Sequence, residues 1–177
     1  PKLATKKNMH RKDFILNTAL GMAGALYVPE LLKRNEIILG HHNKRYKINT
    51  RWSQADVSRN PVNDCHEMVQ DSKGRILLLT NEIKNNVLIY DKSGKLLTTW
   101  GNEYPGAHGF TLFNENGDDV LFICDNNRHQ VIKTTIDGKV LMTLDYPKET
   151  GQYTKAEEYV PTETAVAANG DIYVVDG

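Results

Sequence analysis

Short apolar runs alternate with turn residues through most of the sequence after residue 60. Runs at 75–79, 85–91 and 93–100 are followed by counterparts at 120–124, 128–133 and 137–144, and a third series begins at 161–166 and 171–175. The runs are short and rich in Val, Ile, Leu and Thr, which is typical of β-strands. The Gly, Asn and Asp residues between them are typical of tight hairpins. The pattern therefore predicts antiparallel strands rather than helices.

The runs repeat at a fixed period. Gly74 and Gly117 are turn glycines 43 residues apart, and the next such pair, Gly94 and Gly138, is 44 residues apart. Four short strands in a repeat of about 43 residues are typical of one β-propeller blade. We therefore predict an all-β fold: a β-propeller of four-stranded antiparallel blades. The blades are expected at about 62–102, 103–147 and, incomplete, 159–177.

This number of blades is too small to close a ring. Propellers close with ~4–8 blades, whereas the repeats here supply two blades and the start of a third. An open ring would leave a broad apolar sheet face and unpaired strand edges exposed to water. We therefore expect the sequence to be part of a longer protein.

The first 28 residues differ from the rest. A basic segment at 2–12 precedes mildly apolar residues at 14–28. This layout predicts a helical export signal at 1–28, too short to be a comfortable transmembrane helix. The run Arg11-Lys-Asp-Phe-Ile15 is similar to a twin-arginine signal with Lys in place of the second Arg. We expect a periplasmic or extracellular protein without a stable membrane span after signal cleavage; an amphipathic surface helix is the alternative.

Charge separates the two ends of the chain. Residues 1–50 hold ten Lys and Arg against three Asp and Glu, whereas the remainder holds twelve against nineteen. The net charge of zero provides no broad basic surface to displace counterions from phosphates, so we expect no nucleic-acid partner. Residues 29–61 are polar and predict a linker or a strand that leads into the repeats.

The repeats resemble NHL-type six-bladed β-propellers over residues 62–177. Four segments carry a closer resemblance: Ala107-His-Gly-Phe-Thr-Leu112, Cys124-Asp-Asn-Asn-Arg-His-Gln-Val-Ile-Lys133, Tyr159-Val-Pro-Thr-Glu-Thr-Ala-Val166 and Gly170-Asp-Ile-Tyr-Val-Val-Asp-Gly177. Motifs similar to these occur in this order in the peptidylglycine (peptidylamidoglycolate) amidating lyase family. The resemblance implies a central channel that holds zinc and a nearby structural calcium. It also implies cleavage of a hydroxyglycine-extended peptide into an amide and glyoxylate.

The same resemblance implies two metal-ligand positions. His108 falls on the first zinc-ligand position, and the carbonyl of Phe110 falls on a calcium-ligand position. Neutral imidazole suits a zinc ion that keeps an open coordination position. The family's catalytic Tyr would follow Gly177, and Thr80-Asn-Glu82 stands where the family has an Arg. No catalytic residue is therefore assigned.

Other polar residues recur at equivalent places in the repeats. His66 stands before its turn glycine as His108 does, and Thr162 takes this place in the third repeat. His66 is thus a second candidate metal ligand, and both imidazoles either bind metal in the channel or form hydrogen bonds there. Glu67 and Glu163 each follow by one residue, so they should point the opposite way and form polar contacts rather than an acid/base pair.

Several other residues favour structural roles. Asp125 closes a predicted strand and should cap the following turn with its carboxylate, and His129 should form a structural hydrogen bond. Cys65 and Cys124 lack metal-ligand spacing and are either paired or reduced.

Three functions remain open from the sequence. The leading hypothesis is an exported NHL-type propeller that acts, as a metal-dependent amidating-lyase-like enzyme, on a peptidic or small polar substrate in the central channel. The second is a non-catalytic propeller that binds a protein or glycan. The third is a lactonase-like hydrolase that uses calcium and carboxylates.

Overall fold

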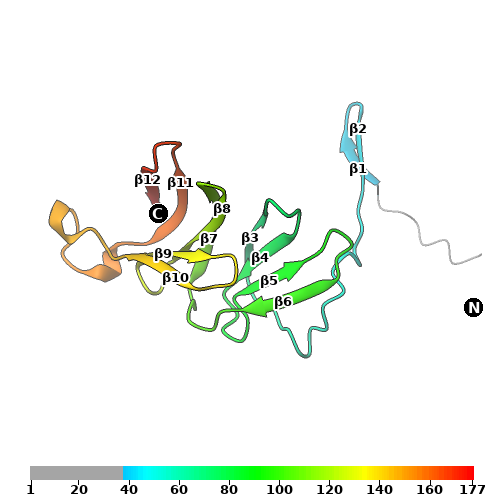
Figure 1. Ribbon diagram of the computed structural model, residues 1–177, viewed down its shortest axis with the longest axis horizontal. Coiled ribbons are helices and arrows are strands. Elements are labelled where there is room, and N and C mark those ends of the chain that lie inside the picture. The colour runs from blue at the N-terminus through cyan, green and yellow to red at the C-terminus, as the bar shows by residue number, and fades with distance from the viewer. Residues whose placement is uncertain (1–37) are drawn as a thin grey trace, which may run out of the picture. The chain divides into compact units, whose positions relative to one another are not determined.

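A computed structural model describes residues 38–177 (Figure 1). The predicted export signal and its helix, at 1–28, lie outside these residues. The chain divides into two units after Asn49. In the first unit, β1 (Ile38–His41) and β2 (Lys44–Lys47) form an antiparallel hairpin. Within residues 38–177 we find no helix with the length and apolar character required to cross a bilayer.

The second unit, 50–177, contains three antiparallel sheets in chain order. The first sheet has the order β3 (Cys65–Gln70), β4 (Ile76–Thr80), β5 (Val87–Tyr90) and β6 (Leu96–Trp100). The second has the order β7 (Ala107–Glu115), β8 (Asp118–Asp125), β9 (Gln130–Thr135) and β10 (Val140–Leu144). The third pairs β11 (Pro161–Val166) with β12 (Ile172–Asp176). Two short 3-10 helices, Lys148–Thr150 and Ala156–Glu158, lie between β10 and β11.

These sheets confirm the all-β class and the four-stranded antiparallel repeat. Each four-stranded sheet is a simple meander, because each of its strands pairs with the strand next to it in the sequence. The turn residues explain this topology. In the β5–β6 turn, the Asp91 carboxylate accepts hydrogen bonds from the amides of Ser93 (2.8 Å) and Lys95 (3.2 Å). Gly94 in the same turn has φ +88°, a conformation that favours glycine. Closure of the sheets into a ring stays a prediction.

The polar segment before the first sheet packs along it. The Trp52 ring lies 5.3 Å from the Tyr90 ring, and the indole Nε1 donates to the carbonyl of Lys92 at 3.2 Å. Further on, the Gln54 amide donates to the carbonyl of Gly94 at 2.9 Å. Residues 50–61 belong to the segment predicted as a lead-in, and they pack against the β5–β6 turn of the first sheet.

The apolar core lies between the first and second sheets. Leu77 and Leu79 of β4 pack in one cluster with Phe110 of β7 and with Leu121 and Ile123 of β8, all fully buried. A second, smaller cluster lies on the other face of the second sheet, towards the third. All four residues of β5 are buried, which explains why its sequence is apolar throughout rather than alternating.

The first strands of the three sheets are neighbours. β7 contacts β3 and β4 on one side and β11 on the other, and Figure 1 shows the three sheets following one another in chain order. This arrangement brings the starts of β3, β7 and β11 close together, and the polar residues predicted as site residues lie there.

Candidate functional site

Each first strand is irregular near its start. The pairing register shifts between Cys65 and Glu67 in β3, between Ala107 and Phe110 in β7, and between Pro161 and Glu163 in β11. Such bulges insert an extra residue into a strand and redirect the side chains beside it. His66, His108 and Thr162, which the repeat placed at equivalent positions, fall in these three bulges.

The structure brings the two predicted histidines together. The imidazole rings of His66 and His108 are stacked, with centroids 4.2 Å apart and planes inclined by 30°. We call them the imidazole pair. His66 is exposed and His108 is half-buried. The sequence left open whether both point to one place, and their stacking shows that the starts of β3 and β7 lie side by side.

A hydrogen bond fixes the ring of His108. Its Nδ1 lies 3.0 Å from the carbonyl oxygen of Thr162 on β11. A carbonyl oxygen can only accept, so we assign the proton of this bond to Nδ1. In the neutral ring, Nε2 then keeps its lone pair. Histidines that bind metals are typically held in this way, with the second nitrogen donating to a carbonyl or carboxylate.

The imidazole pair does not by itself complete a metal site. Among residues 38–177, no group of three or more His, Cys, Asp and Glu side chains is arranged to hold a metal ion. Phe110, predicted to offer its carbonyl to calcium, lies two residues after His108 on the same strand, and its amide donates to Glu67 Oε2 at 2.7 Å. His108 and His66 therefore supply two imidazoles, and zinc and calcium binding stay predictions.

Two carboxyl groups meet beside the imidazole pair. Glu67 of β3 and Glu163 of β11 lie close enough for their side chains to interact, although they belong to different sheets. Glu163 Oε1 also accepts from the amide of Thr164 (2.7 Å) and lies 2.8 Å from the Thr111 hydroxyl on β7. The two carboxyls, which we call the glutamate pair, thus connect β3, β7 and β11.

The sequence predicted polar contacts for these glutamates but not their meeting. Alternation along a strand predicts that Glu67 points away from His66, but a bulge lies at these residues, and alternation does not say which residue of another sheet lies opposite. The available signal was Gly109, whose missing side chain lets the β11 backbone approach: a Cβ there would lie 2.5 Å from the carbonyl oxygen of Thr162. A glycine next to a predicted site residue in a strand indicates such an approach.

Partial burial shifts the acid groups of the site. Burial, assisted by the side-chain interaction with Glu163, raises the pKa of Glu67 to about 7. Burial also raises the pKa of the Cys124 thiol to about 12, and the nearby Glu163 and Glu67 add to the effect. Cys124 is therefore a packed thiol rather than a nucleophile.

The glutamate pair should make the fold less stable at alkaline pH. Glu67 has a pKa of about 7 in the folded state against 4.5 for an unperturbed Glu. Its contribution to the free energy of unfolding is therefore complete below about pH 4.5 and is lost as the pH rises to 7. For this partly solvated group we expect a loss of about 1–2 kcal/mol. Urea unfolding at pH 5 and pH 8 measures it.

A neutral substitution separates this effect from all other titrations. Glu67→Gln keeps an acceptor for the Phe110 amide and a donor for Glu163, but it cannot ionise. Between pH 5 and pH 8, the free energy of unfolding of the variant should therefore fall by about 1–2 kcal/mol less than that of the wild type. Glu157→Gln, at an exposed position, is the matched control and should follow the wild type. Identical pH profiles for Glu67→Gln and the wild type would contradict the raised pKa of Glu67.

The remaining predicted residues have structural roles, as the sequence indicated. Asp125 Oδ1 accepts from the amides of Asn127 and Arg128, both at 2.9 Å, which confirms the turn cap. The ring of His129 lies with Nδ1 2.7 Å from the carbonyl oxygen of Tyr159, which confirms its hydrogen bond. Cys65 and Cys124 are both free thiols.

Fold and site together define an all-β protein with meander sheets whose first strands carry an imidazole pair and a glutamate pair. The sequence matches no protein-family model and no curated protein. The resemblance to NHL-type propellers and to amidating lyases therefore stays a prediction.

Proposed function

We propose that residues 62–177 are consecutive blades of an NHL-type β-propeller in a periplasmic or extracellular protein. Two observations support the proposal. The first two sheets repeat the same four-strand meander with the period read from the sequence, and the first strands of all three sheets lie side by side. In a propeller the first strands of the blades line the central channel, so β3, β7 and β11 would form part of its wall. Export rests on residues 1–28 and is tested by the location of the full-length protein.

At the mouth of this channel we propose a divalent metal site that includes the imidazole pair. The observation that carries it is the hydrogen bond from His108 Nδ1 to the Thr162 carbonyl, because it leaves Nε2 as the ligand atom. His66, stacked beside it, is the second candidate ligand. Further ligands would come from outside residues 38–177.

The activity proposed for this site is that of an amidating-lyase-like enzyme acting on a peptidic or small polar substrate. Zinc, when bound, would supply Lewis-acid polarisation of a substrate oxygen. The protein's own part is orientation. Thr162 fixes the ring of His108, and the bulges of β3 and β7 turn both imidazoles to the same place. Structural calcium at the Phe110 carbonyl belongs to the same proposal.

Zinc binding by the chain tests the site directly. In calorimetric titrations with Zn²⁺ at pH 7.5, we expect His108→Ala to weaken binding at least about tenfold, since removing even an outer partner of a ligand costs that much. His41→Ala is the matched control, because His41 is an exposed histidine of the first unit, and it should bind as the wild type does. Equal zinc affinity of His108→Ala and the wild type would remove His108 from the site.

A non-catalytic binding propeller is the second candidate, and the ring geometry favours it. Stacked imidazoles inclined by only 30° present their faces to each other, whereas ligands of one metal direct their nitrogen atoms towards a common point. If zinc does not bind, the imidazole pair and the glutamate pair would instead be polar contacts that stabilise the channel wall. The mouth would then recognise a protein or glycan.

A further inference from the structure

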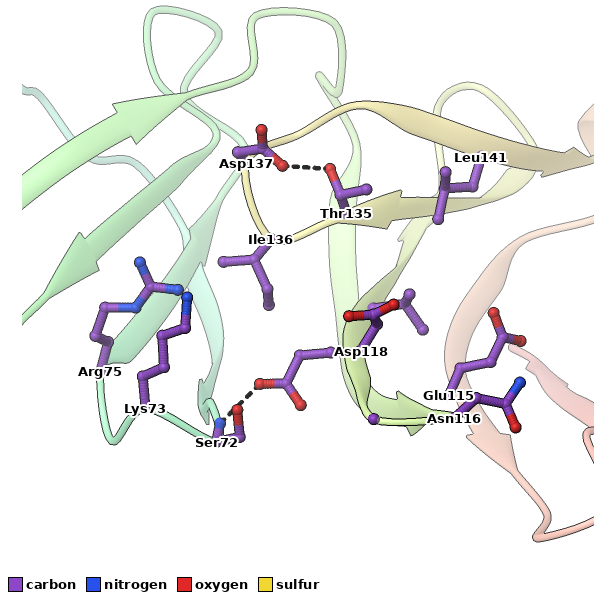
Figure 2. A pocket seen from close by; sticks show the side chains of 13 residues that line it. Ser72, Lys73, Arg75, Glu115, Asn116, Asp118, Thr135, Ile136, Asp137 and Leu141 are labelled. Carbon is purple, nitrogen blue, oxygen red and sulfur yellow. Dashed lines mark hydrogen bonds between the residues drawn. The ribbon is translucent and has the colours of Figure 1, made fainter.

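A cleft of about 610 Å³ lies between the first two sheets, at the end of their first strands that is remote from the imidazole pair (Figure 2). The β3–β4 turn forms one wall, and the β7–β8 and β9–β10 turns form the other. Because β7 runs from His108 to this turn at ~3.4 Å per residue, the cleft is roughly 25 Å from the imidazole pair. It is a separate site.

Hydrogen bonds hold the two walls in place. Asp119, at the second sheet, accepts from the amide of Ser72 across the cleft, with Oδ2 2.8 Å from the nitrogen, and its Oδ1 accepts from Asn114 at 3.0 Å. On the opposite wall, Arg75 Nε and Nη2 are each 2.6 Å from Oδ2 of Asp71, whose side chain is fully buried. A cleft with fixed walls loses little entropy when a ligand binds.

The walls carry opposite charges. Lys73 and Arg75 extend from the β3–β4 turn, and Figure 2 shows Asp118 and Glu115 on the other side. Glu115 is already engaged, since its carboxylate is 2.7 Å from Lys133 Nζ. Within residues 38–177, Lys73 and Asp118 form no ion pair. Asp137, on the same wall as Asp118, also forms no ion pair there, but its carboxylate accepts a hydrogen bond from the Thr135 hydroxyl at 2.5 Å. Lys73 therefore faces a wall on which Asp118 is the carboxylate without a hydrogen-bond partner among residues 38–177.

Part of the cleft lining is apolar. Val120 is buried, Ile136 is half-buried, and Leu141 is 46% exposed at the edge of the cleft. Binding sites for small molecules typically combine such apolar surface with a few placed polar groups. A ligand that matches this cleft has an anion at one end, a cation at the other and an apolar middle.

We propose that this cleft binds a small zwitterion of that kind, represented by a short peptide with free termini. Lys73 receives the carboxylate, Asp118 receives the ammonium group, and the apolar middle covers Ile136 and Leu141. The site does not depend on the imidazole pair or on the proposed enzyme activity, and zinc has no part in it.

Blocked peptides test the charge requirement. We expect the full chain to bind the tripeptide Ala-Leu-Ala saturably in calorimetric titration up to about 10 mM, the range of weak small ligands. N-acetylation of the tripeptide removes the ammonium group, and C-terminal amidation removes the carboxylate. Each change should weaken binding at least about threefold, the ratio expected when one exposed ion pair is lost. Equal affinity for all three peptides, or no saturation, would overturn the proposal.

Variants assign each charge to its wall. Lys73→Gln should weaken binding of the free tripeptide about threefold, and amidation of the peptide should then have no further effect. Asp118→Asn should also weaken binding about threefold, and acetylation of the peptide should then have no further effect. Lys155→Gln and Glu157→Gln change equally exposed charges outside the cleft and should leave the affinity unchanged. If Lys73→Gln still binds the amidated peptide more weakly than the free tripeptide, the proposed contact of Lys73 is wrong. If Asp118→Asn still binds the acetylated peptide more weakly, the proposed contact of Asp118 is wrong.

Discussion

Phe110→Ala should lower the free energy of unfolding of the chain by about 3–5 kcal/mol, the largest effect expected from a single substitution here. The side chain is fully buried and packs against Leu77 and Leu79 of the first sheet and against Leu121 of its own. Its removal costs the transfer energy of the ring and leaves a cavity that two stiff sheets cannot close. Chemical denaturation followed by tryptophan fluorescence measures the change.

Leu97→Ala is the matched control for this prediction. Leu97 is 47% exposed on β6, so its truncation should change stability by about 0.5 kcal/mol or less. If the two substitutions had similar effects, the buried contact between the first and second sheets would not exist as described. Phe110→Ala keeps the backbone carbonyl, so the prediction tests the core and not the proposed calcium position.

Gly109→Ala should destabilise the packing of the second sheet on the third by about 2–3 kcal/mol, as overpacking of a close contact does. A Cβ at this position would lie 2.5 Å from the Thr162 carbonyl oxygen and 2.9 Å from the Glu163 Cα, and both are backbone atoms that cannot rotate away. The β11 strand must therefore move. Both the imidazole pair and the glutamate pair depend on β11, so the substitution should also disturb the site.

The disturbance has a spectroscopic signature. Nitrogen-15 chemical shifts of the His108 ring report which nitrogen carries the proton, and Gly109→Ala should abolish the fixed Nδ1–H form that the Thr162 carbonyl imposes. Gly117→Ala is the control: a Cβ there meets no atom within 4 Å, and its cost of about 1 kcal/mol comes only from φ +101°. An unchanged His108 ring in Gly109→Ala would refute the close approach of β11.

The strands and their order were predictable because they depend on local chemistry. Short apolar runs and the Asp and Gly residues of the turns determine each hairpin, as Asp91 and Gly94 show in the β5–β6 turn. The recurrence of these signals at one period was sufficient to predict two four-stranded meanders. Equivalent positions in the repeats likewise marked His66 and His108 as candidate site residues, and the structure stacks their rings.

The contacts between sheets were not predictable in the same way. The meeting of Glu67 and Glu163 depends on the positions of three bulges and on the space left by Gly109. The cleft with Lys73 and Asp118 depends on how two separate hairpin turns face each other. Neither arrangement has a local signal, because no residue in one turn specifies the distance to another.

By itself, the sequence determined the class of fold, the strand order and the candidate site residues, since hydrogen bonding within a hairpin involves residues close along the chain. Only the tertiary structure decided that the two glutamates meet and which nitrogen of His108 faces the Thr162 carbonyl. It also showed where two unpaired charges face each other. These features depend on burial and on distances between sheets, which arise only when apolar faces pack and exclude water.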